Sequence, residues 1–162
     1  MKIGSLLARL HELETDLADE LRALGERHAA DHDVFHQCHT FALQCERHAA
    51  ALQPMAARYG EEVDDEGPGF WSGILESARR AASTSVGRVP ESGLLLLRDL
   101  RTLFLQAEEC SITWVMAGQA AQAARDQELL EVVRTCHLET EIQVKWFVTR
   151  IKVASPQALV VG

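Results

Sequence analysis

The stretch SLLARLHELETDLADELRAL, Ser5–Leu24, decides the fold class of this 162-residue chain. Its leucines recur at steps of three and four residues, which places them on one face of an α-helix. That face consists of Leu6, Leu10, Leu13, Leu17, Leu21 and Leu24. Charged residues such as Glu12 and Asp16 fall on the opposite side. The stretch therefore predicts an amphipathic helix over about 5–28, with Ser5 as its N-cap, that must bury its leucines against other helices.

The remaining sequence is also helical in pattern. Asparagine and strand-like alternation are absent, and good helix formers such as alanine, leucine and glutamate dominate. Apolar periodicity predicts long helices over about 33–59, 90–124 and 126–153, and a short helix over about 70–82. Gly60 is expected to end the second long helix and Asp126 to cap the fourth, leaving 154–162 as an apolar tail. We therefore predict one all-α domain over residues 1–162.

The lengths of the connections predict how the helices are arranged. A few residues join the first two long helices, and a few join the last two, so each pair is expected to form an antiparallel hairpin. About thirty residues separate the second and third long helices, which is enough chain to cross the length of a bundle. We expect two antiparallel hairpins joined by a long crossover that carries the short helix, with the two middle helices parallel.

Composition excludes several classes of function. The net charge of −8 argues against nucleic-acid binding, which needs a basic surface. No apolar run reaches the ~18 residues that span a bilayer, so no membrane insertion is expected. The N-terminus becomes charged too early for a secretory signal, which favours a cytoplasmic protein. The cysteines are scattered through helical patterns and are expected to be buried apolar side chains rather than disulfides. They are Cys38, Cys45, Cys110 and Cys136.

This pattern of two hairpins and a crossover, over about residues 6–151, resembles the ferritin-like four-helix-bundle superfamily and its small bacterial members. The resemblance implies a dinuclear iron or manganese centre. In that superfamily each of two helices supplies a glutamate and each of the other two supplies Glu-x-x-His, all pointing inward.

Turning each helix by about 100° per residue shows what those positions hold here. Glu14 lies close to the leucine face of its helix, at the place of the family's single glutamate. The Glu-x-x-His of the second helix reads Cys45-Glu46-Arg47-His48, so Cys45 replaces the glutamate and His48 faces inward. The third and fourth helices offer Ser111, Thr140 and Gln143. We therefore expect a polar core layer, with one inward carboxylate, in a bundle that has lost its dinuclear centre.

Two interpretations of that layer remain open. A buried glutamate and histidine must be paired, and a Glu14–His48 contact supported by Thr140 or Gln143 would satisfy both. This favours a non-catalytic binding or interaction module with no cofactor and no catalytic residue. Alternatively, Glu14 and His48 hold iron or manganese in an oxidoreductase or metal-binding protein, with Glu108 and Glu139 rotating inward.

Histidines also gather where the first two helices meet. His32, His36 and His39 are expected on the surface of the second helix, away from its apolar side. Histidines spaced by one turn can bind a metal, and they titrate near neutral pH. The sequence thus predicts a surface histidine patch that either binds a metal or changes its charge near neutral pH.

The third helix is apolar on two sides. Leu94, Leu105, Ile112 and Met116 lie opposite the side that carries Leu100 and Trp114. A helix with two apolar sides is buried on both. We expect a homodimer through this helix and the crossover, with the tail 158–161 able to dock on the same surface. The alternative is that the crossover alone covers it.

Overall fold

The computed structural model describes residues 2–63 and 92–161, and these are almost entirely helical. The elements are α1 (Ile3–Arg27), α2 (His32–Arg58), α4 (Ser92–Ala124), α5 (Gln127–Pro156) and the π-helical turn η1 (Gln157–Val161). The all-α class and the four long helices are as predicted. The short helix predicted over 70–82 lies outside the described residues.

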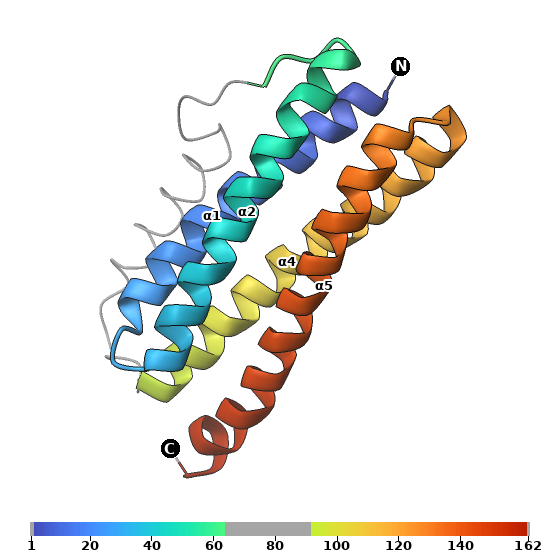
Figure 1. Ribbon diagram of the computed structural model, residues 1–162. Coiled ribbons are helices and arrows are strands. Elements are labelled where there is room, and N and C mark those ends of the chain that lie inside the picture. The colour runs from blue at the N-terminus through green and yellow to red at the C-terminus, as the bar shows by residue number, and fades with distance from the viewer. Residues whose placement is uncertain (1, 64–91, 162) are drawn as a thin grey trace.

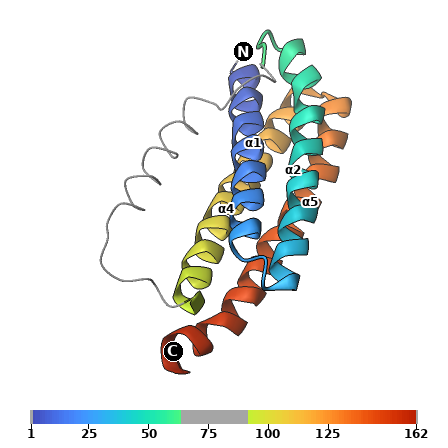
Figure 2. The same ribbon diagram turned by 90° about the vertical axis from the view of Figure 1, so that its left-hand side faces the viewer.

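The four long helices form two antiparallel hairpins packed side by side, α1 with α2 and α4 with α5 (Figure 1). Figure 2 shows that α2 ends at one end of the bundle while α4 begins at the other, so these two helices run parallel. Between the hairpins, α1 packs against α4 and α2 packs against α5, and the second of these interfaces is the smaller. The core of the bundle is therefore enclosed by α1, α2, α5 and α4 in that order around it.

The leucine face of α1 is buried, as predicted, with one difference at its start. Leu10, Leu17, Leu21 and Leu24 lie in the core, whereas Leu6 packs at its edge and Leu7 is fully buried instead. Because α1 packs against both α2 and α4, its buried side is wider than a single stripe.

Helix α1 begins at Ile3 with no side-chain cap, so the predicted cap at Ser5 is wrong. The Ser5 hydroxyl lies within the first turn and donates to Glu61 Oε1 at 2.8 Å. The Ser5 side chain, which the local sequence assigned to capping, therefore bonds to a residue that is distant in the sequence. This contact ties the start of α1 to the segment that follows α2.

The starts of α2 and α5 and the end of α2 follow the local sequence. Asp31 and Asp126 cap α2 and α5, and Asp126 accepts from the Leu129 N–H at 3.0 Å, which confirms that predicted cap. Gly60 has a φ of +84° directly after α2, the left-handed geometry that glycine adopts without strain.

Helix α5 continues to Pro156 and η1 follows it, so the predicted helix end near residue 153 and tail over 154–162 are wrong. Ala158 is buried, and a Cβ placed on Gly93 of α4 would lie 3.5 Å from its methyl group. Packing against α4 thus keeps the chain helical past the proline. Leu159, Val160 and Val161 remain exposed.

Charged residues tie the two hairpins together at the end of the bundle where α1 joins α2. The buried Asp99 of α4 accepts from Arg27 at 2.9 Å and lies 2.8 Å from Nε2 of His28. Its second oxygen pairs with Arg98 at 3.2 Å. A carboxylate on one hairpin is thereby held by cationic side chains from both.

A second set of contacts ties the hairpins at the opposite end. Arg58 and the Tyr59 hydroxyl, at the end of α2, each donate to Oδ2 of Asp126 at 2.7 Å. The same aspartate caps α5. The middle of the bundle therefore lies between two polar contacts that fix how the hairpins meet.

No helix in these ranges is long and apolar enough to cross a membrane.

Candidate functional site

Three of the side chains predicted to face inward meet in the middle of the bundle. Glu14 comes from α1, and Cys45 and His48 come from successive turns of α2. All three are buried, and one ligand-type atom of each lies within 4.8 Å of the other two. We call these three residues the Glu14 cluster.

Both oxygens of Glu14 have hydrogen-bond partners. The indole Nε1–H of Trp114, on α4, donates to Oε1 at 2.6 Å. His48 Nδ1 lies 3.2 Å from Oε2, so the predicted contact between glutamate and histidine is present. A buried carboxylate held in this way is satisfied without a lysine or arginine.

His48 connects the buried carboxylate to the surface. Its Nε2 lies 3.3 Å from Oε2 of Glu139, on α5, whose side chain is 24% exposed. Arg47 pairs with the same oxygen of Glu139 at 3.2 Å. A neutral imidazole donates through only one nitrogen, so bonds to two carboxylates require one further proton on the ring or on a carboxyl group.

Cys45 completes the cluster as a buried thiol. Burial, followed by the negative charge of Glu14, raises its pKa well above the ordinary value. Its Sγ lies 3.8 Å from both Oε1 and Nε2 of the Gln143 side-chain amide. The same Nε2 donates to Gln44 Oε1 at 2.9 Å. The sulfur therefore remains a protonated thiol at neutral pH.

Two further thiols lie within the electrostatic reach of Glu14. Burial raises the pKa of Cys110 well above its usual range and that of Cys136 to about 12, and in both cases the Glu14 carboxylate is the next cause. All four cysteines, Cys38 and Cys45 included, are buried and free of disulfides, which confirms the prediction. Glu14 therefore acts on thiols from three helices.

Gln143 and Glu139 contact the cluster through Cys45 and His48, whereas the other predicted residues do not reach it. Ser111 is half-buried and lies 3.2 Å from Nε2 of His137. The Thr140 hydroxyl donates to the carbonyl of Cys136 at 3.0 Å. Glu108 is exposed. Support for the Glu14–His48 pair comes from Trp114 and Glu139 instead of Thr140 or Gln143.

Trp114 is the functional side chain that sequence reasoning missed, because its inward position indicated only an apolar core residue. A signal was available, since a buried tryptophan usually directs its N–H at an acceptor. Glu14 was the inward acceptor already known from the helix pattern.

The three histidines of the predicted patch lie on two different sides of α2. His32 and His36 stack with ring centroids 6.3 Å apart and line a hollow of about 260 Å³ beside Trp146 and Arg150 of α5. His39 lies on the side of α2 that faces α1, where its Nδ1 is 3.2 Å from Arg22.

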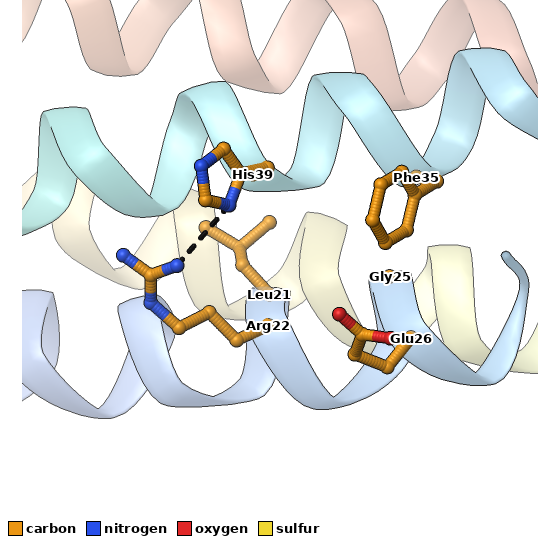
Figure 3. A pocket seen from close by; sticks show the side chains of 6 residues that line it. All are labelled: Leu21, Arg22, Gly25, Glu26, Phe35 and His39. Atoms are coloured by element: carbon orange, nitrogen blue, oxygen red, sulfur yellow. Dashed lines mark hydrogen bonds between the residues drawn. The ribbon is translucent and has the colours of Figure 1, made fainter.

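Figure 3 shows the hollow beside His39, between α1 and α2. Its volume is about 150 Å³, and it is lined by Leu21, Arg22, Gly25, Glu26, Phe35 and His39. A Cβ on Gly25 would lie 3.0 Å from Cys38 Cβ, so this glycine lets the helices approach closely. The arginine and histidine of this hollow already contact each other.

The residues present do not fit a dinuclear iron or manganese centre. Such a centre uses about four carboxylates and two histidines to neutralise two divalent ions. Glu14 is the buried carboxylate of this region, while Glu46 and Glu141 are exposed and Glu46 pairs with Arg22 at 2.7 Å.

Comparison with known proteins does not assign the chain to a family: no family model matches it, and no curated protein or solved structure matches it.

Proposed function

We propose that this chain is a ferritin-like four-helix bundle that serves as a binding or interaction module of the cytoplasm and lacks a dinuclear metal centre. Two antiparallel hairpins with parallel middle helices support the ferritin-like assignment. The hydrogen-bonded Glu14 cluster, in place of a set of carboxylates, supports the loss of the dinuclear centre.

An exposed apolar surface carries the interaction part of the proposal. The side of α4 opposite Leu100 and Trp114 exposes large apolar residues, and α5 adds others. The hydrogen bond between Ser111 and His137 sets α4 against α5 at one level. Because α4 and α5 are antiparallel, the residues that follow Ser111 and His137 lie on the same side of the helix pair. This places Ile112 next to Leu138.

We call this surface the α4/α5 face. It consists of Leu105, Ile112, Val115, Met116, Leu138 and Ile142. Ile112 is 58% exposed and Leu138 is 60% exposed, although such side chains are favoured in contact with other apolar groups. A homodimer that buries this face, together with the crossover outside the described residues, is the assembly that we propose.

Sedimentation velocity of the full chain tests this proposal. The wild-type chain is expected to sediment as a dimer at micromolar concentration, and the double variant Ile112→Glu/Leu138→Glu as a monomer, because charges on the face oppose its burial. Leu43→Glu is the matched control, since Leu43 is 46% exposed on α2 and should leave the dimer intact. A monomeric wild-type chain, or equal dissociation by the control, would overturn the proposal.

The alternative expected from the sequence, an iron or manganese protein built on Glu14 and His48, has less support. In its favour, Glu14 and His48 do lie together and Glu139 does contact His48. Glu108 is exposed, and Cys45 offers sulfur where these ions prefer oxygen.

A further inference from the structure

We propose that the Glu14 cluster is a site for a single thiophilic divalent ion of the zinc class, held by Glu14, Cys45 and His48. This inference is independent of the interaction role proposed above, because it concerns the middle of the bundle rather than its surface.

The donor set selects the class of ion. One carboxylate oxygen, one imidazole nitrogen and one sulfur lie within 4.8 Å of one another and are buried. Zinc and cobalt accept this mixture of donors, whereas magnesium, calcium and manganese favour sites made of oxygen alone. Three protein donors suit one such ion and are too few for two.

The surrounding contacts supply the outer shell that such sites require. The indole of Trp114 holds Oε1 of Glu14, which leaves Oε2 directed at the imidazole. Glu139 contacts His48 Nε2 and favours the imidazole tautomer that carries its proton on Nε2. The lone pair of Nδ1 is then free to bind an ion, as in metal sites where a histidine donates its other N–H to a carboxylate.

The charge balance permits an ion inside the bundle. The Cys45 sulfur binds an ion as a thiolate, so the ion replaces the thiol proton, which passes to solvent without a redox step. The thiolate of Cys45 and the carboxylate of Glu14 together then balance the two positive charges of the ion.

Partly exposed side chains cover His48 at the interface between α2 and α5. This is the smaller of the two interfaces between the hairpins, and Glu139, which is partly exposed, together with the exposed Arg47 covers His48 there. An ion entering at this point would meet the carboxylate of Glu139 first.

Cobalt titration of the chelator-treated full chain tests the proposal. Co²⁺ bound to a thiolate gives a sulfur-to-metal charge-transfer band in the near ultraviolet. We expect one equivalent to produce this band, excess Zn²⁺ to remove it, and the Cys45 thiol proton to be released in weakly buffered solution near neutral pH.

Cys45→Ser should abolish the band. Cys38→Ser is its matched control, because Cys38 is buried on the same helix but is no part of the cluster, and this variant should retain the band. Glu139→Gln, at a partly exposed position, keeps the three ligands and should weaken cobalt binding about 10- to 100-fold.

Circular dichroism checks that each variant folds, and Glu139→Gln keeps the test decisive if Cys45→Ser does not fold. The proposal is overturned if cobalt gives no charge-transfer band, if Glu139→Gln binds as tightly as wild type, or if binding is lost instead on changing His32 and His36. The last outcome would assign the ion to the surface histidines.

Discussion

The middle of the bundle and its ends hold buried carboxylates in different ways. Glu14, in the middle, meets an indole N–H and an imidazole. Asp99, near one end, meets the guanidinium groups of Arg27 and Arg98 as well as His28.

Distance from solvent explains the difference. At the end of the bundle, long arginine side chains reach a buried carboxylate while their stems and edges stay in contact with water. In the middle, four packed helices leave room only for side chains anchored close by, so the indole of Trp114 and the imidazole of His48 hold the carboxylate there. The middle is therefore the region where removing one partner leaves others unpaired, and where a cation would be accommodated most readily.

The largest effect is expected from Glu14→Ala, which leaves the Trp114 N–H and His48 without their buried acceptor. The free energy of unfolding should fall by about 3–5 kcal/mol. Urea denaturation followed by circular dichroism measures it.

Glu14→Gln is the control for that loss, because the amide oxygen still accepts from Trp114, and it should lower the unfolding free energy by only about 1–3 kcal/mol. Equal losses for the two variants would show that the charge of Glu14, rather than its side-chain volume or its acceptor for Trp114, matters in the middle of the bundle.

A smaller effect is expected from Asp99→Asn at the end of the bundle. The arginines that lose the charge can turn to water, so the unfolding free energy should fall by about 1–2 kcal/mol. The measurement is the same urea denaturation. If Asp99→Asn proved as damaging as Glu14→Ala, the proposed contrast between end and middle would be wrong.

The opposite end predicts a dependence on pH. The Leu129 N–H, then Tyr59 and Arg58, lower the pKa of the Asp126 carboxyl below its ordinary value. A carboxyl whose pKa is lower in the folded state stabilises the fold above its unfolded pKa of about 3.9 and loses that contribution as pH falls through the folded value.

Thermal unfolding between about pH 5 and pH 2.5 measures this contribution. Asp126→Asn keeps the N-cap, since asparagine also caps helices, and should show a shallower loss of melting temperature in acid. An unchanged acid profile would remove Asp126 as one of its causes.

The smallest effect concerns thiol reactivity. Burial raises the pKa of Cys38 and of Cys136 to about 12, so neither should react with iodoacetamide at pH 8 unless the bundle opens. Glu14→Gln should speed labelling of Cys136, near the middle, more than labelling of Cys38, as followed by mass spectrometry of peptides. Equal acceleration at both would indicate global rather than local opening.

A large part of the site follows from helical geometry alone. Counting about 100° per residue places Glu14, Cys45 and His48 inward, and the structure buries all three. The same count brought Ser111 and Thr140 into the layer, where they instead bond to His137 and to a backbone carbonyl. The angular position of a residue predicts the side of the helix on which it lies. It predicts neither the side-chain rotamer nor how far the neighbouring helix is shifted along the bundle axis.

The amino-acid sequence by itself determined the all-α class, the presence of four long helices and the burial of Glu14, because apolar spacing acts within one helix. Only the tertiary structure decided that Trp114 holds Glu14, that Glu139 reaches His48 and that Asp99 joins the hairpins. Those contacts join residues on different helices, so they depend on the relative height and rotation of the hairpins. That arrangement is set by packing over the whole interface and cannot be predicted from any one segment of the sequence.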